Sequence, residues 1–271
     1  MKYESIGSVN WTREELTNSL EEFLSLYDQR PIRNNEGGMT SSHMFATWFL
    51  CKQLNPKAII ESGIWKGQSS WLLETTCPDA KIISIDPALQ LREYISNRIA
   101  YTPLDFSRLT WDDWDKDTTL CFFDDHYGVD RIKQAADFGF KHILYEDNYH
   151  DGRGNSSHPQ YGHLANTDPL NQGPRSYSPK SSLLLNNESG QWLQDVTEIY
   201  YEFPPIYSAV DSPRGHGWAK ISREDYLSIT PPPLLTERED KFDVYVREAP
   251  DYTWISYIRL KSDSFFKEQN K

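Results

Sequence analysis

The sequence has few cysteines, no run of basic residues and no apolar segment long enough to cross a membrane. Its three cysteines lack metal-type spacing, which favours a reducing compartment, and Cys121, inside an apolar run, is expected in the core. The 40 acidic residues outnumber 28 basic ones and give a net charge of −12, which argues against nucleic acid as a partner. With no leader-like segment either, we expect a soluble, cytoplasmic protein without a membrane partner.

The N-terminal region is predicted to be helical. Thr12 and Glu15 have the capping-box spacing, and apolar residues recur on one side of a predicted helix over 12–27. A second helix is predicted over 42–54. The apolar stripe of the first helix is suited to pack against another copy of the chain, which would make a homo-oligomer.

Five short apolar runs follow, separated by polar or helical stretches, at 58–60, 82–85, 99–104, 120–123 and 142–145. Such alternation predicts an α/β fold with a Rossmann-like, doubly wound, mostly parallel sheet and helices on both faces. Right-handed crossovers would bring the carboxyl ends of these strands to one edge, where α/β sheets bind ligands.

The C-terminal part is predicted to complete the same sheet. Residues 191–203 show the spacing of an amphipathic helix, whereas 242–246 and 254–260 resemble two strands joined near Pro250. These two strands predict an antiparallel ending to the sheet.

We therefore expect one domain over residues 1–271. Between the fifth run and the predicted C-terminal helix, the chain is rich in Gly, Pro, Asn and Ser and has no periodicity, which is typical of a lid or binding loop. The predicted parts are an N-terminal helical cap over 1–55, a cofactor-binding half over 56–150, a lid and acceptor loop over 151–189, and a C-terminal helix and strand pair over 190–271.

The first two apolar runs enclose a glycine-bearing turn. Residues 58–70 read AIIESGIWKGQSS, where Gly63 and Gly67 allow a tight turn and close approach of a ligand to the backbone. Asp86 ends the second run, about 20 residues further on, where an acid can bind ribose hydroxyls. The spacing is G-x-x-x-G, so the dinucleotide fingerprint G-x-G-x-x-G is absent.

Carboxylates follow all five runs. They are Glu61, Asp86, Asp105, the pair Asp124 and Asp125, and the pair Glu146 and Asp147, with Asn148 after it. Oxygen donors suit Mg²⁺, and a cation would offset repulsion among the acids, so the groups after the fourth and fifth runs predict a metal site. Solvated strand ends are the alternative, because Asp and Asn favour turns.

These segments resemble the class I S-adenosylmethionine (SAM)-dependent methyltransferases, specifically the divalent-cation-dependent small-molecule O-methyltransferases. The segment GMTSSHMFATWFLCKQLNPKAIIESG is similar to the part of the catechol and caffeoyl-CoA enzymes that leads into their glycine turn. This resemblance implies that the methionine part of the cofactor lies near Met39, Thr40 and Ser41. ESGIWKGQS resembles the turn itself, which implies cofactor contacts from Glu61, Gly63, Gly67 and Ser69, with Asp86 as the ribose-binding acid.

FFDDHY and LYEDNY resemble the family segments that hold its metal. The same segments also resemble the cephalosporin hydroxylase-like and macrolide-sugar O-methyltransferase groups, which leaves two ligand sets open. One set is Asp125 with Asp147 and Asn148; the other is Asp124 or Asp125 with Glu146 and Asp147. The resemblance also implies that Asp125 contacts the cofactor and takes part in catalysis.

The general base is left open by the sequence, because no lysine of the catechol type stands beside Asp125, a departure that favours the sugar-type branch. His126 and His150 each have an imidazole suited to proton removal, but either is equally suited to a surface position. Asp105 is suited either to bind the adenine amine or to cap a turn.

The leading hypothesis is SAM-dependent, Mg²⁺-assisted O-methyl transfer to a hydroxyl of a small metabolite, such as a sugar, a polyketide-sugar conjugate or a vicinal diol. One alternative is an NAD-linked oxidoreductase or epimerase on a Rossmann-like fold. Another is a non-catalytic protein that binds the cofactor.

Overall fold

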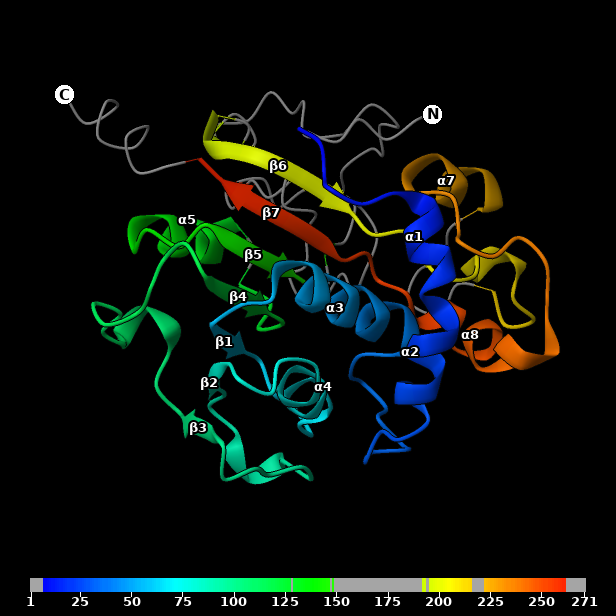
Figure 1. The fold of residues 1–271 in the computed structure, drawn as a ribbon. Coiled ribbons are helices and arrows are strands. Elements are labelled where there is room, and N and C mark those ends of the chain that lie inside the picture. Colours follow the sequence, from blue (N-terminus) through cyan, green and yellow to red (C-terminus); the bar gives the residue numbers. More distant parts are fainter. Residues whose placement is uncertain are drawn as a thin grey trace.

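The computed structural model describes residues 7–127, 129–146, 148, 192–193, 195–215 and 222–261, and it contains a seven-stranded sheet (Figure 1). In chain order the strands are β1 (Ala58–Ser62), β2 (Lys81–Ile85), β3 (Ile99–Thr102), β4 (Thr119–Phe123), β5 (His142–Tyr145), β6 (Thr197–Glu202) and β7 (Ser256–Leu260). In space their order is β3-β2-β1-β4-β5-β7-β6.

The first five strands are parallel, and β7 runs antiparallel to both β5 and β6. This arrangement confirms the predicted mostly parallel sheet with an antiparallel C-terminal strand. The strand order reverses between β1 and β4, and α/β sheets bind ligands at the carboxyl ends of the strands beside such a switch point.

The carboxyl ends of the parallel strands lie level with one another. Ser62 at the end of β1 pairs with Ile85 of β2 and with Phe123 of β4. Ile85 pairs in turn with Thr102 of β3, and Phe123 with Tyr145 of β5. The acids that follow these residues therefore start from one edge of the sheet, as predicted, and we call this edge the carboxyl rim.

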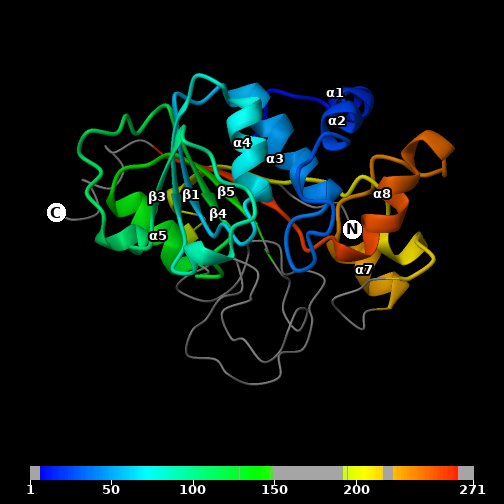
Figure 2. The same ribbon diagram turned by 90° about the horizontal axis from the view of Figure 1, so that it is seen from below.

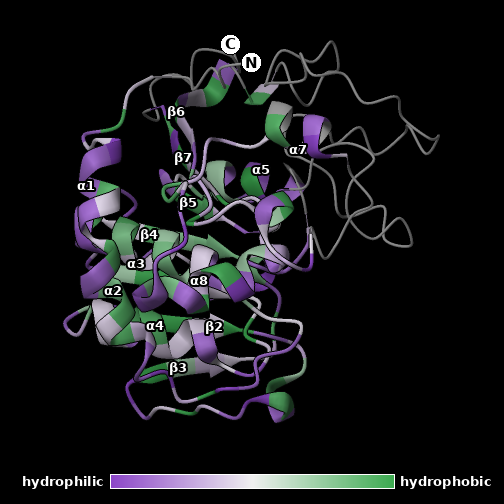
Figure 3. Ribbon diagram, turned by 90° about the vertical axis from the view of Figure 1, so that its right-hand side faces the viewer, coloured by the Kyte–Doolittle hydropathy of each residue, from purple (hydrophilic) through white to green (hydrophobic). Residues whose placement is uncertain are grey.

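Helices cover both faces of the sheet. Figure 2 shows α3 (Ser41–Leu54) and α4 (Gln68–Thr76) on one face and α5 (Val129–Asp137) on the other. Successive strand residues alternate between the two cores: Ile59 belongs to the core beneath α3, and Ile60 to the core beneath α5. Figure 3 shows hydrophobic colouring along the strands and α3.

The predicted N-terminal capping box is confirmed, but the single helix predicted over 12–27 is divided into two. The Thr12 side chain accepts a hydrogen bond from the Glu15 amide, and the Glu15 carboxylate accepts one from the Thr12 amide, which is the capping box. The helical region consists of two helices, α1 (Arg13–Asn18) and α2 (Leu20–Tyr27), where one helix was predicted.

The apolar stripe of these two helices packs within its own chain. Its buried residues are Leu16, Leu20, Phe23 and Tyr27. The ring of Phe23 lies 5.4 Å from that of Phe45 on α3, measured between centroids. This stripe thus packs against α3 and does not support the predicted homo-oligomer. The homo-oligomer stays a prediction.

Two predicted elements of the C-terminal part are wrong. The helix predicted over 191–203 is right at 192–193 and 195–196 and wrong at 197–202, which form strand β6. The spacing of apolar side chains there also suits a strand rich in β-branched and aromatic residues. The predicted strand over 242–246 is largely helix α8 (Asp243–Glu248), whose buried Tyr245 and Val246 join Phe242 and Ala249 at helical spacing. The second antiparallel partner of β7, besides β5, is therefore β6 and not residues 242–246.

The predicted lid over 151–189 lies outside the described residues, as do Asp147 and His150. In the part of the chain that the structure describes, no helix has both the length and the hydrophobicity of a membrane span.

Candidate functional site

The turn after β1 needs glycine at both predicted positions. Gly63 has φ +95° and Gly67 has φ +93°, a region that favours glycine. A Cβ on Gly63 would collide with the carbonyl oxygen of Asp124, and one on Gly67 would lie 2.8 Å from the carbonyl oxygen of Tyr94. The turn thus lies directly against the end of β4, at the switch point of the sheet.

Asp86, the predicted ribose-binding acid, holds this turn in place. Its Oδ2 accepts hydrogen bonds from the amides of Ile64 and Trp65, at 2.9 and 3.2 Å, and its Oδ1 accepts one from the amide of Ala88, at 2.7 Å. Its position at the end of β2 beside the turn is as predicted. Its role toward a ribose stays a prediction.

Trp65, in the middle of the turn, was not identified from the sequence as a site residue. It has φ +50°, a conformation that bulky side chains rarely adopt, and 43% of its surface is exposed. Its indole Nε1 donates a hydrogen bond to the carbonyl oxygen of Glu36, 3.1 Å away. An exposed aromatic ring in a strained conformation is a recurrent mark of a binding loop.

Glu61 lies beneath the turn and is fully buried. Its carboxylate accepts hydrogen bonds from the hydroxyls of Ser70, at 2.6 Å, and Ser84. Burial raises the pKa of the Glu61 carboxyl, and hydrogen bonds from Ser69, Ser70 and Ser84 oppose this rise. Glu61 and Ser69 therefore join β1 to the start of α4, while their predicted cofactor contacts stay predictions.

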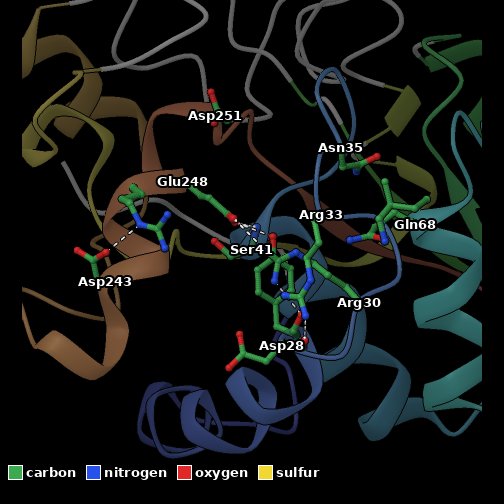
Figure 4. Close-up of polar contacts among 12 residues, drawn as sticks. Asp28, Arg30, Arg33, Asn35, Ser41, Gln68, Asp243, Glu248 and Asp251 are labelled. Atoms are coloured by element: carbon green, nitrogen blue, oxygen red, sulfur yellow. Dashed lines mark hydrogen bonds and ion pairs between the residues drawn. The ribbon is translucent and has the colours of Figure 1, made fainter.

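The predicted methionine-binding segment lies at the start of α3 (Figure 4). The amide of Ser41, the first residue of α3, donates to Glu248 on α8, whose carboxylate also accepts from the hydroxyl of Tyr27. Met39 is buried. The hydroxyls of Thr40 and Ser41 are buried too and have no hydrogen-bond partner among the described residues. Polar atoms left unsatisfied at a helix N-terminus suit a polar ligand group.

Asp125, after β4, is held by a buried arginine that was not identified from the sequence. Its Oδ2 accepts a 2.8 Å hydrogen bond from Nε of Arg131 and another from the Ser62 hydroxyl. Burial raises the pKa of the Asp125 carboxyl, while the charge of Arg131 and the Ser62 hydroxyl oppose that rise. One carboxylate thus connects α5 to the end of β1.

Asp105, after β3, binds the same arginine. Its Oδ2 accepts a 2.8 Å hydrogen bond from Arg131, and its Oδ1 accepts one from the Ser107 amide at 2.9 Å. Hydrogen bonds from Arg131 and Ser107 hold the pKa of the Asp105 carboxyl well below its usual range. These contacts correspond to the turn-capping alternative, and its binding to adenine stays a prediction.

Glu146, after β5, pairs with a histidine of α3. Nδ1 of His43 lies 2.6 Å from the Glu146 carboxylate, and both side chains are buried. The backbone amide of Thr253 donates to Nε2 of His43 at 3.0 Å, so Nε2 is the acceptor and Nδ1 carries the proton. This contact links the predicted cofactor segment of α3 to the predicted metal ligands.

The remaining candidates on this side lie at the same rim. The side-chain amide of Asn148 donates to the hydroxyls of Tyr200 and Ser256, at 2.7 Å each. Asp124 donates its amide to the carbonyl of Ser62, and His126, after Asp125, has φ +60°. The described residues include no group of three or more His, Cys, Asp or Glu side chains placed to hold a metal ion.

No family model matches this chain, and no curated protein matches it. Among solved structures, the SAH-bound Podospora anserina methyltransferase PaMTH1 is 13% identical, with a TM-score of 0.40 over 95% of this chain and 100% of that one. The SAM complex of the O-methyltransferase TomG from Streptomyces achromogenes is 16% identical, with a TM-score of 0.36 over 50% of this chain and 72% of that one.

An apo structure of CmcI is 18% identical, with a TM-score of 0.35 over 44% of this chain and 58% of that one. The alignment thus spans less than two thirds of the length of CmcI. All three TM-scores lie below 0.5, so these likenesses by themselves assign no function to the chain.

Proposed function

We propose that this chain is a SAM-dependent O-methyltransferase that methylates a hydroxyl of a small metabolite with the assistance of a divalent cation. The acceptor class we propose is a sugar, a polyketide-sugar conjugate or a vicinal diol. The observation that carries the proposal is the glycine turn at the switch point between β1 and β4, in a sheet whose last strand is antiparallel.

The strand order of the sheet also argues against the alternative of an NAD-linked oxidoreductase or epimerase. The dinucleotide-binding fold has parallel strands in the order 3-2-1-4-5-6. Here the antiparallel β7 lies between β5 and β6, and the turn reads G-x-x-x-G. Both features favour a mononucleoside ligand such as SAM.

Methyl transfer depends more on how donor and acceptor are positioned than on reactive side chains. Methyl transfer from a sulfonium to oxygen is an in-line displacement, and ordered approach of donor and acceptor supplies about 7 kcal/mol or more of the rate enhancement. The turn at Gly63, braced by Asp86, would hold the nucleoside. The unsatisfied hydroxyls of Thr40 and Ser41 would bind its methionine part.

Asp125 and Glu146, which follow the neighbouring strands β4 and β5, would offer carboxylate oxygens to a divalent cation. Asp147, which lies outside the described residues, would complete the set. When bound, the cation would stabilise the acceptor oxyanion and orient a diol. The proton of the acceptor would pass to a base, for which His126, next to Asp125, is the described candidate.

Thermal shift and calorimetric titration with SAM, SAH and NAD test the cofactor. We expect SAM and SAH to raise the melting temperature and NAD to leave it unchanged, because only a ligand of the folded state stabilises it. A rise with NAD and none with SAH would refute the proposal. Mass spectrometry of copurifying small molecules would then search for the acceptor.

The metal assistance is tested separately. EDTA, or the substitution Asp147→Ala, is expected to abolish methyl transfer while SAH binding persists. Asp130→Ala serves as the matched control, because Asp130 lies on α5 with 61% of its side chain exposed. Unchanged turnover after chelation and in Asp147→Ala would show that the enzyme works without a cation.

A further inference from the structure

Arg131 is a buried charge at the carboxyl rim. It lies in the first turn of α5, and only 1% of its side chain is exposed. The guanidinium carbon lies 4.2 Å from the ring centroid of Tyr127 and 5.4 Å from that of Phe106. A cation so thoroughly removed from water is stable only where carboxylates and hydrogen-bond acceptors compensate it.

Each nitrogen of this guanidinium has a partner. Nε donates to Asp125, one terminal nitrogen donates to Asp105, both at 2.8 Å, and the other donates to Gln134. Asp105 follows β3 and Asp125 follows β4, so one side chain joins segments from two different strands. The planar fork of arginine serves two carboxylates at once, which a lysine ammonium does less well.

The contact with Asp125 continues to the glycine turn. The carboxylate of Asp125 accepts a hydrogen bond from Ser62, the last residue of β1. The next residue, Gly63, packs so tightly on this segment that an added Cβ would lie 3.0 Å from the amide nitrogen of Asp125. Arg131 is therefore two contacts away from the turn that would bind the cofactor.

We propose that Arg131 is a positioning residue, which fixes Asp125 against the glycine turn and thereby holds the turn in its cofactor-binding conformation. This inference rests on the proposed function, because SAM or SAH is the ligand whose binding would report it. Arg131 contacts no ligand in this proposal. It acts through Asp125, and this dependence distinguishes it from a residue that merely stabilises the fold.

The test is a double-mutant cycle read out as the calorimetric Kd for SAH. Arg131→Met in the wild-type background is expected to weaken SAH binding about tenfold, within the range for coupled neighbours. In the Asp125→Asn background the same substitution should change the Kd less than about twofold. Arg131→Lys, which keeps the charge, should recover part of the affinity.

Two controls separate positioning from general destabilisation. Lys133→Met removes a positive charge from the same helix, where 39% of the Lys133 side chain is exposed, and it should leave the Kd unchanged. All titrations are made well below the lowest melting temperature of the set, so that every variant is folded. Arg131→Gln, which removes the charge but keeps a polar side chain, replaces Arg131→Met in the cycle if the methionine variant does not fold.

The outcomes are distinct. If wild-type protein does not bind SAH, the proposed function fails and this inference fails with it. If wild-type protein binds SAH but Arg131→Met binds equally well, the positioning role is wrong and the proposed function stands. An equal loss of SAH affinity in the wild-type and Asp125→Asn backgrounds would also overturn the positioning role, since Arg131 would then act independently of Asp125.

Discussion

The two halves of the carboxyl rim hold their acids by different means. In the first half, at β1 and β2, Glu61 is held by serine hydroxyls and Asp86 by backbone amides, all of them neutral donors. Asp105, after β3, is the exception, because it is held by Arg131 from the second half. In the second half, at β4 and β5, Asp125 is held by the charged guanidinium of Arg131, and Glu146 by the neutral imidazole of His43. Neutral donors keep the local charge of a carboxylate, whereas an arginine compensates it.

This difference suits the two tasks proposed for the rim. The first half would form the turn around a nucleoside, for which backbone shape is decisive. The second half gathers acids that would repel one another, and its contacts come from α5 and α3, on opposite faces of the sheet. The second half should therefore respond more strongly to the loss of a single partner.

Substitution at the junction of the two halves should have the largest effect. Gly63→Ala places a Cβ against Asp124 at φ +95°, and we expect the free energy of unfolding to fall by about 3 kcal/mol, with loss of SAH binding. Gly215→Ala is the control, because φ there is +65° but no atom lies within 4 Å of the added Cβ. Urea denaturation measures both. Equal costs would show that strain, and not contact with β4, governs Gly63.

In the second half, His43→Leu removes the donor to a buried carboxylate. We expect a loss of about 2–3 kcal/mol in the free energy of unfolding, because Glu146 would be left without this partner. His43→Asn, whose side-chain amide can replace Nδ1, should recover part of the loss. A leucine variant as stable as the asparagine variant would contradict the importance of this contact.

In the first half, Asp86→Ala removes the acceptor of two backbone amides of the turn and of the Ala88 amide. Because the turn is partly exposed and water can replace the acceptor, we expect a loss of only about 1–2 kcal/mol and an SAH affinity about tenfold lower. Asp79→Ala, at an exposed position after α4, is the matched control. If Asp86→Ala leaves both quantities unchanged, the first half does not depend on its neutral donors.

The smallest expected effect concerns acid stability. Since Arg131 and Ser107 lower the pKa of Asp105 in the folded state, its stabilising contribution is complete above the ordinary Asp pKa, about 4, and is lost as the pH falls toward the lowered value. Asp105→Asn should therefore be less stable than wild type at pH 7 and should lose less stability on acidification.

Urea unfolding between pH 3 and 7 measures this difference. Asp130→Asn, on the exposed side of α5, is the control and should follow the wild-type curve. Parallel curves for Asp105→Asn and wild type would show that the contact with Arg131 contributes nothing to acid stability.

Local sequence patterns were sufficient to predict the rim. Apolar runs that end in acids identified five parallel strands, and the glycines identified the turn, because both signals lie within a few consecutive residues. The same kind of signal failed at 197–202 and 242–246, where apolar spacing suits either a helix or a strand and only packing decides.

The partners of the acids could not be predicted in this way. Arg131 lies 26 residues from Asp105, and His43 lies 210 residues from the Thr253 amide that determines its protonated nitrogen. Neither residue stands out in its local sequence, since an arginine in a polar helix is usually solvated. Only the folded sheet brings such pairs together.

The antiparallel strand β7 has a consequence for folding. In the described sheet, β6 joins the other strands only through β7, which comes later in the chain. During synthesis on a ribosome, β6 would therefore wait with unpaired edges until Ser256–Leu260 leaves the exit tunnel. Nascent chains stalled before that point should offer chaperones the open edge of β5 and both edges of β6.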